Sequence, residues 1–371
     1  MRKMILLLII VIFIVSVFSG CSSDEKYIWS KTYDSGKDDF ALGVAADTSN
    51  NTIVTGYVSN GNDNDIYTIK YNPNGNVLWE KLYDGGNNDY SLAAVTDSGN
   101  NVIVTGFVNN GVNNDYFTIK YDINGNIIWT RSHDAGNNEN AQGLATDSKD
   151  NIIVTGEAYP GIDVNFYTIK YDTDGNILWE KSYDGGDKEH AFDVVTDSND
   201  NVIVTGYSSS GSGYDFCTIK YDRDGKFLWK KTYDGGNTDK PYGVATDSND
   251  NIIVAGETLN GNNVDFLMVK YDPNGNIIWT KTYDTGNDDY ALGLATDSTG
   301  NIIVTGYITK DQKKNFYTIK YDPRGNILWE KSYNGGKDGY SLDVAIDQNN
   351  KIIVTGYVFN GTNNDFFTIK Y

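Results

Sequence analysis

The sequence predicts an all-β protein: a seven-bladed β-propeller with four antiparallel strands in each blade. The first observation is a repeat of fifty residues, marked by the seven tryptophans of the chain, which are Trp29, Trp79, Trp129, Trp179, Trp229, Trp279 and Trp329. The second is that each unit contains four short strand-like segments. The third is that the series begins with a lone fourth strand and finishes with a third. The N-terminal strand is therefore expected to complete the last blade.

One unit, residues 90–134, shows how the strands are recognised. Its strand segments are rich in β-branched and aromatic residues and are separated by clusters of Asp, Asn and Gly, which form turns. No apolar period of 3.6 residues is present, so no helix is expected. A parallel β-helix is the structural rival, but its coils are usually shorter and lack paired hairpin turns. The four strands are expected at 91–96, 102–108, 115–121 and 127–133.

Closure of the ring follows from the two ends of the repeat series. Residues 27–34 read as a fourth strand without the first three, and residues 365–371 read as a third strand without a fourth. Pairing these segments would leave no long exposed edge between the first and last units. The propeller is thus expected to span 27–371, with blades at about 35–84, 85–134, 135–184, 185–234, 235–284, 285–334 and 335–371 together with 27–34.

The first twenty residues lie outside the repeats and have the features of a signal peptide. Arg2 and Lys3 precede an apolar run at 5–18, and Ser19 and Gly20 precede Cys21. This arrangement resembles the bacterial lipobox, which implies cleavage before Cys21 and lipidation of its thiol. Residues 21–26 would then be a linker. The alternatives are an ordinary signal peptide with an incidental cysteine, or an uncleaved anchor. The resemblance implies an extracytoplasmic protein, anchored by lipid to the cell membrane or outer membrane, at the cell surface or in the periplasm.

Charge and cysteine content exclude some classes of partner and of stabilisation. Without residues 1–20 the chain has 28 Lys and Arg against 50 Asp and Glu, a net charge of −22. Nucleic acid is therefore not expected as a partner, because phosphate binding needs a basic surface. Cys217 would be the remaining cysteine, so no internal disulfide can form. It replaces an aromatic residue or Leu of the other units and is expected to be a small buried hydrophobic residue, the alternative being a reactive thiol.

Two resemblances to known repeats support the propeller. The segment Y-D-G-G-N-N-D-Y-S-L-A-A-V-T-D-S-G-N-N-V-I-V-T-G, residues 83–106, is similar to the bacterial β-propeller repeat family called SBBP, and the similarity covers all seven units. That family is common on secreted and surface proteins. Residues 70–79 look like the docking repeat of quinoprotein-like propellers, which usually have eight blades. The resemblances imply a surface protein and assign no chemistry.

The long links between strands are where the repeats differ most, so a binding face is expected there. These links are rich in Asp and Asn, and they are interpreted either as solvated polar loops or as a polar surface for a glycan, a peptide or a cationic partner. The basic segment 310–314 is the exception. Aromatic side chains at the start of the innermost strands are candidate binding residues, which would stack on a ligand at the channel mouth or pack between blades. These residues are Phe40, Tyr90, His190, Tyr290 and Tyr340.

No cofactor is expected, with calcium as the one alternative. Asp172 and Asp174, and likewise Asp222 and Asp224, resemble half of a calcium-binding loop. Calcium prefers six to eight oxygen ligands, and no Glu follows at the required spacing. A hairpin turn accounts for the same residues.

The main functional hypothesis is a membrane-anchored, non-catalytic module that binds or scaffolds a protein or glycan partner. The alternative is a glycan-active enzyme, a hydrolase or lyase that uses carboxylates of the channel or of the long-link face. Its weak catalytic candidates are Glu157, Glu257, Asp193 and Asp343, which replace other residue types at their positions in the repeat. A pair of carboxylates about 5–10 Å apart would suit glycoside hydrolysis.

Overall fold

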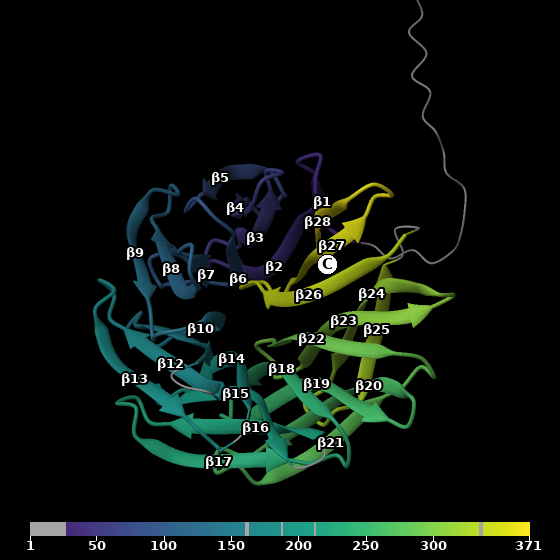
Figure 1. Ribbon diagram of the computed structural model, residues 1–371. Coiled ribbons are helices and arrows are strands. Elements are labelled where there is room, and N and C mark those ends of the chain that lie inside the picture. Colours follow the sequence, from purple (N-terminus) through teal and green to yellow (C-terminus); the bar gives the residue numbers. More distant parts are fainter. Residues whose placement is uncertain (1–26, 160–162, 187, 211–212, 334–336) are drawn as a thin grey trace, which may run out of the picture.

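A computed structural model of the protein describes residues 27–159, 163–186, 188–210, 213–333 and 337–371. Within these residues 28 strands form seven sheets of four strands, and neighbouring strands run antiparallel. The sheets are arranged as blades around a central channel (Figure 1). The predicted seven-bladed β-propeller is confirmed.

Blades 1 to 4 are each built from four consecutive strands, which follow one another from the channel outward. They are β2 (Asp39–Ala46), β3 (Thr52–Ser59), β4 (Asn64–Tyr71) and β5 (Val77–Tyr83); β6 (Asp89–Thr96), β7 (Val102–Asn109), β8 (Asn114–Tyr121) and β9 (Ile127–His133); β10 (Asn140–Thr146), β11 (Ile152–Ala158), β12 (Asn165–Tyr171) and β13 (Ile177–Tyr183); and β14 (Glu189–Thr196), β15 (Val202–Ser210), β16 (Gly213–Tyr221) and β17 (Phe227–Tyr233).

Blades 5 and 6 follow the same order, whereas blade 7 takes its outer strand from the other end of the chain. The strands are β18 (Asp239–Thr246), β19 (Ile252–Asn260), β20 (Asn263–Tyr271) and β21 (Ile277–Tyr283); β22 (Asp289–Thr296), β23 (Ile302–Lys310), β24 (Lys313–Tyr321) and β25 (Ile327–Tyr333); and β26 (Gly339–Ile346), β27 (Ile352–Phe359), β28 (Asn364–Lys370) and β1 (Trp29–Tyr33).

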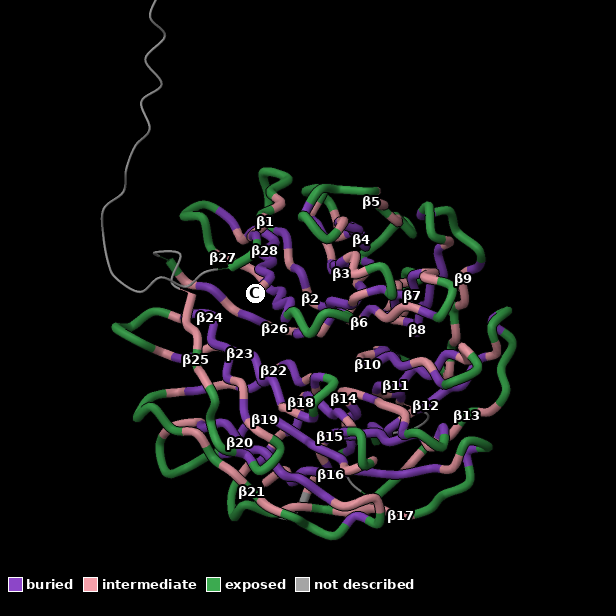
Figure 2. The backbone as a smooth tube through the Cα atoms, turned by 180° about the vertical axis from the view of Figure 1, so that it is seen from behind, coloured by how far each residue is buried: buried purple, intermediate pink, exposed green. Residues whose placement is uncertain are grey.

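The second and third strands of each blade form the core. In β4 every residue after Asn64 is buried, because each blade is covered on both faces by its neighbours. The outer strand β5 has no fully buried residue. Burial therefore decreases from the inner strands to the rim (Figure 2). This arrangement explains why the second strand of each unit is a continuous apolar run rather than an alternating one.

Strand β1 closes the ring as the incomplete first unit predicted. It pairs with β28 from Trp29 opposite Lys370 to Tyr33 opposite Phe366. The Trp29 side chain is buried, and its indole N–H donates to the Pro73 carbonyl oxygen of blade 1 at 3.0 Å. Four other tryptophans donate in the same way to the next blade, from Trp79, Trp129, Trp179 and Trp229 to Ile123, Thr173, Arg223 and Pro273. The tryptophans thus link neighbouring blades.

A buried ion pair in each blade explains the repeated Lys and Asp. Lys70 Nζ lies 2.8 Å from Asp47 Oδ2, and both side chains are almost fully buried. Burial alone raises the pKa of Asp47, but hydrogen bonds from Lys70 and Asn51 outweigh it, so the pKa is lowered. The equivalent pairs are Lys120–Asp97, Lys170–Asp147, Lys220–Asp197, Lys270–Asp247, Lys320–Asp297 and Lys370–Asp347.

The repeated glycine of the second strand allows a close approach to the innermost strand. A Cβ atom on Gly56 would lie 1.9 Å from the Phe40 carbonyl oxygen. Next to this contact, β2 has a β-bulge between Ala41 and Gly43. A bulge inserts an extra residue and redirects its side chain. Here the extra residue is Leu42, which lines the channel.

The predicted signal segment and the predicted lipidation site Cys21 lie outside the described residues. Among the residues that the structure describes, no helix is long and apolar enough to cross a membrane.

Candidate functional site at the channel mouth

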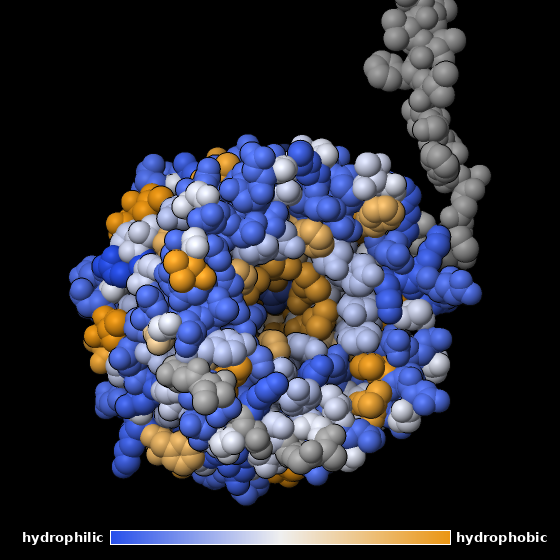
Figure 3. All heavy atoms as spheres, viewed as in Figure 1, coloured by the Kyte–Doolittle hydropathy of each residue, from blue (hydrophilic) through white to orange (hydrophobic). Residues whose placement is uncertain are grey.

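The channel is lined by the extra residue of seven equivalent bulges. The cavity they enclose has a volume of about 300 Å³. Its wall is mostly apolar, as Figure 3 shows around the central hollow. The lining bulge residues are Leu42, Leu92, Gln142, Phe192, Tyr242, Leu292 and Leu342. Blades 3, 4 and 5 differ from the others here, since they supply Gln, Phe and Tyr in place of Leu.

Two of the predicted carboxylates, Asp193 and Asp343, also line this cavity. Asp193 accepts hydrogen bonds from the backbone N–H groups of Val194 and Val244, each at 2.8 Å. Asp343 makes the equivalent bonds to blades 7 and 1, so each carboxylate joins two blades. Burial raises the pKa of Asp193 to about 7 and that of Asp343 to about 6. Both groups can therefore hold a proton near neutral pH.

Above the cavity, on the face that carries the β3–β4 and β5–β6 links, eight aromatic rings form a continuous arc over blades 6, 7, 1 and 2. We call this the aromatic arc. Each ring contacts the next, with centroids 4.5–5.0 Å apart, a separation typical of favourable aromatic pairs. In order, the rings are Tyr290, Tyr307, Tyr340, Tyr357, Phe40, Tyr57, Tyr90 and Phe107.

Blades 3 to 5 complete the mouth with polar and charged side chains and with Tyr207, which contacts the His190 ring; we call this the polar arc. Glu157 is hydrogen-bonded to His190 and accepts from Asn140 Nδ2 at 2.6 Å. Lys240 Nζ lies 3.6 Å from Glu257 Oε1. Burial raises the pKa of Glu257. Burial also acts to raise the pKa of Glu157, but its hydrogen bonds with His190 and Asn140 reverse the shift.

The sequence-predicted aromatic set thus lies at the mouth, half-buried, and each member stacks on a ring from the end of the second strand. For example, Tyr290 stacks on Tyr307. The second-strand rings were missed, although they keep the same fifty-residue period. The structure also brings together Glu157 and His190, which the sequence analysis treated separately. It does not bring Glu157 into contact with Asp193, since they belong to different levels of the channel.

The turn aspartates are engaged by their own turns. Asp172 Oδ1 accepts from the backbone N–H groups of Asp174 and Asn176, and Asp172 Oδ2 accepts from the Asn176 amide. Asp222 accepts the same two backbone bonds, from Asp224 and Lys226. The side-chain geometry is that of an Asx turn. Calcium binding at these turns stays the untested alternative to the expectation of no cofactor.

Cys217 is fully buried in the contact between blades 3 and 4. Burial raises the pKa of its thiol to about 12. The thiolate is the reactive form of cysteine, so the environment of Cys217 is that of a structural residue.

Comparisons with known proteins agree with the fold. Residues 248–277 match the model of a family described as a β-propeller domain of unknown function (DUF5122). No curated protein matches. Similar solved structures include the Pan2 WD40 domain of Neurospora crassa, with a TM-score of 0.59 and 13% identity, covering 93% of this chain and 94% of that one.

Two further similar structures are a protein solved with a segment of a partner and a hydrolase. Sqt1 of Chaetomium thermophilum, solved with the N-terminus of ribosomal protein L10, has a TM-score of 0.56 and 11% identity, covering 92% of this chain and 98% of that one. A puromycin hydrolase has a TM-score of 0.57 and 12% identity, covering 86% of this chain and 50% of that one. At these identities the likeness shows the fold alone. Together with the repeat, these findings define the chain as a β-propeller repeat protein.

Proposed function

We propose that this protein is a non-catalytic binding module that holds a segment of a protein partner at the channel mouth. The observation that carries the proposal is that the repeat units differ in sequence at the channel mouth. Buried positions such as the Lys–Asp pairs recur in all seven blades. At the mouth, blades 3 to 5 replace aromatic residues by Asn140, Glu157, His190, Lys240 and Glu257. Folding does not require that change, since the other blades fold without it.

The mouth favours a segment with both basic and apolar side chains. The aromatic arc can bind cations and apolar groups on its ring faces, as Lys314 Nζ of the chain itself does at 5.6 Å from the Tyr290 ring and 5.1 Å from the Tyr307 ring. Glu157 and Glu257 lie in the polar arc, paired with His190 and Lys240, within a chain whose formal charge is −20. A protein of similar fold, Sqt1, has been solved with the N-terminus of ribosomal protein L10.

The proposal includes the location expected from the sequence. The chain would be an SBBP-type propeller lipidated at Cys21 and held outside the cytoplasm by that anchor. The strongly acidic body would be repelled by anionic lipid headgroups. The lipid alone would therefore hold the protein at the membrane and leave the channel mouth accessible.

The test compares the mature protein with variants that restore the repeat. Glu157→Tyr combined with His190→Tyr restores an aromatic residue at one mouth position in blade 3 and one in blade 4. Partners captured from envelope extract would be identified, and their binding segments titrated as synthetic peptides. We expect the double variant to bind at least about 10-fold more weakly. Lys226→Asn, which restores the repeat on the opposite face, is the control. Equal binding by the double variant would refute the proposal, and binding of glycans alone would redirect it to sugars.

The glycan-active enzyme is the second candidate. Asp193 and Asp343 favour it, because carboxyl groups with raised pKa in an apolar cavity can act as general acids. Turnover of a polysaccharide that is abolished by Glu157→Gln or Asp193→Asn would establish this alternative over the binding module.

A further inference from the structure

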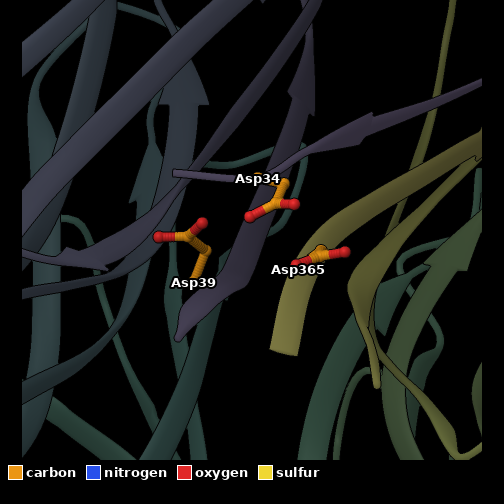
Figure 4. Close-up of side chains that lie close together, drawn as sticks. All are labelled: Asp34, Asp39 and Asp365. Carbon is orange, nitrogen blue, oxygen red and sulfur yellow. The ribbon is translucent and has the colours of Figure 1, made fainter. Parts of the chain in front are cut away.

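Carboxylates from three segments meet at junctions between blades. At the junction of blades 1 and 2 they are Asp65 at the start of β4, Asp84 after β5, and Asp89 at the start of β6. One oxygen of each lies within 4.8 Å of the others. Figure 4 shows the equivalent group at the ring closure, where Asp34 and Asp39 of the N-terminal segment face Asp365 of β28. The other three triads are Asp115, Asp134 and Glu139; Asp215, Asp234 and Asp239; and Asp265, Asp284 and Asp289.

A hydroxyl group closes two of these five triads. Ser35 Oγ donates to Asp39 Oδ1 at 2.8 Å, and Thr285 Oγ1 donates to Asp289 Oδ1 at 2.8 Å. The other three triads have Gly85, Ala135 and Gly235 at this position of the repeat, so the same donor is missing there. We call the first two triads capped and the other three open.

In each open triad a buried carboxylate oxygen lacks a hydrogen-bond partner. These atoms are Asp89 Oδ1, Glu139 Oε2 and Asp239 Oδ1, joined in the first triad by Asp65 Oδ1. The four side chains are at most 2% exposed. A buried oxygen left without a partner is costly, and a buried charge more so. The open triads therefore favour a positive partner, which the hydroxyl hydrogen of Ser35 or Thr285 partly supplies in the capped ones.

We propose that the three open triads are binding sites for a divalent cation, and that the ion is Ca²⁺. Three carboxylates offer up to six oxygens, and calcium takes oxygen ligands in flexible geometry. The carboxylates of Asp84, Asp134 and Asp234 are exposed, so an ion can enter from solvent. The ion would neutralise charge between neighbouring blades. This inference is independent of the partner proposed for the channel mouth.

One of the two remaining junctions varies in a way that fits a shared ion. Between blades 6 and 7 all three positions lose their carboxylate together, to Asn315, Asn334 and Gly339. Between blades 3 and 4, Asn165 replaces one carboxylate, whereas Asp184 and Glu189 keep the other two. Loss of all three acidic groups at one junction is expected if they serve one ligand, because a single remaining carboxylate would have no ion to bind.

Calorimetric titration of the mature protein with Ca²⁺ tests the proposal. We expect three sites, with dissociation constants on the order of 0.1–1 mM, as in extracellular modules. At 10 mM Ca²⁺ each site of 1 mM affinity would favour the folded state about 11-fold, so the melting temperature should rise relative to EDTA at equal ionic strength. Mg²⁺ should bind more weakly, since it demands a stricter geometry and keeps its waters.

Three substitutions borrowed from the chain's own repeats make the test specific. Asp65→Asn copies Asn165 and should reduce the stoichiometry from three to two. Gly85→Ser copies Ser35, supplies the missing hydroxyl and should also reduce it to two. The reverse change, Ser35→Gly, should open a fourth site. Asp174→Asn, in a turn on the opposite face, is the control and should leave three sites.

The outcomes separate specific sites from a generally acidic surface. Absence of saturable heat, together with equal melting temperatures in Ca²⁺ and EDTA, would overturn the proposal. Binding whose stoichiometry is unchanged by both Asp65→Asn and Gly85→Ser would also overturn it. So would five equal sites, because the hydroxyl would then not decide which triads bind. A variant that melts in EDTA as the parent does is folded, and its stoichiometry can be compared directly.

Discussion

Replacing Trp29 by alanine should destabilise the folded ring by about 4 kcal/mol. The side chain is only 7% exposed. A buried aromatic side chain of this kind removes about 150–250 Å² from water. At about 25 cal/mol per Å² that is an upper estimate of about 4–6 kcal/mol. The hydrogen bond from its indole to the Pro73 carbonyl oxygen would be lost as well.

Trp129 provides a matched control within the same chain. It is 8% exposed and donates to the Thr173 carbonyl oxygen at 3.1 Å. Trp129→Ala should therefore cost a similar free energy of unfolding. The two tryptophans differ in how their strands are connected. Trp129 lies in β9, which follows β8 through a short turn. Trp29 lies in β1, which is held to β28 only by strand pairing and packing. Only Trp29→Ala should expose the β28 amides to early hydrogen exchange.

Urea unfolding gives the free-energy change, and hydrogen exchange followed by mass spectrometry locates it. The reasoning is refuted if the free energy of unfolding of Trp29→Ala lies within about 1 kcal/mol of that of the parent. It is also refuted if the β28 amides exchange equally fast in both variants. Deletion of residues 27–34 is the stronger perturbation, since it exposes the edge of β28 and invites pairing with other chains. A truncated protein that melted within a degree or two of the parent would show that β1 does not close the ring.

Three other perturbations have expected outcomes. Lys170→Met leaves Asp147 buried and unpaired and should cost about 3–5 kcal/mol in urea unfolding, part of which the added Asp147→Asn should restore. Hydrogen bonds, including that from Lys170, hold the pKa of Asp147 below its usual value, so the stability from such pairs is present above about pH 4 and is lost as pH falls. Acid titration followed by circular dichroism would show this loss. Asp193 contributes a pH dependence of stability in the opposite direction. Because its pKa is raised to about 7, its contribution to stability is lost as pH rises from about 4 to 7, and Asp193→Asn should remove that loss. The Cys217 thiol should react with Ellman's reagent only after unfolding; a fast reaction in the native protein would contradict its burial.

The fold was predictable because its information is carried by local sequence. The period fixes the number of units, and the turn residues divide each unit into strands. The partial units at the ends predicted the pairing of β1 with β28, since each supplies what the other lacks. The contacts made by individual repeated residues were harder to predict. The sequence did not reveal that Lys70 and Asp47 form a buried pair, because they lie on different strands.

The candidate sites depend on contacts between blades, which the repeat alone does not reveal. Acidic residues of the long links were interpreted as solvated loops or a polar surface. The structure instead buries Asp89 fully and places Asp65 beside it from the neighbouring blade. The contrast between Ser35 and Gly85 was present in the sequence, but it had no meaning until the carboxylate beside each was known. Similarly, Glu157 and His190 became a pair only when blades 3 and 4 were set side by side.

The β1–β28 ladder also determines the order in which the molecule can assemble. Trp29 and Lys370 are 341 residues apart in sequence, whereas facing residues of a hairpin such as Thr55 and Thr68 are 13 apart. Loop-closure entropy makes the longer connection about 3 kcal/mol more costly. Individual blades can therefore form early and locally, while the five-residue strand β1 must find its partner last. We therefore expect closure to be a late step of folding and its reversal to be a route for opening the ring.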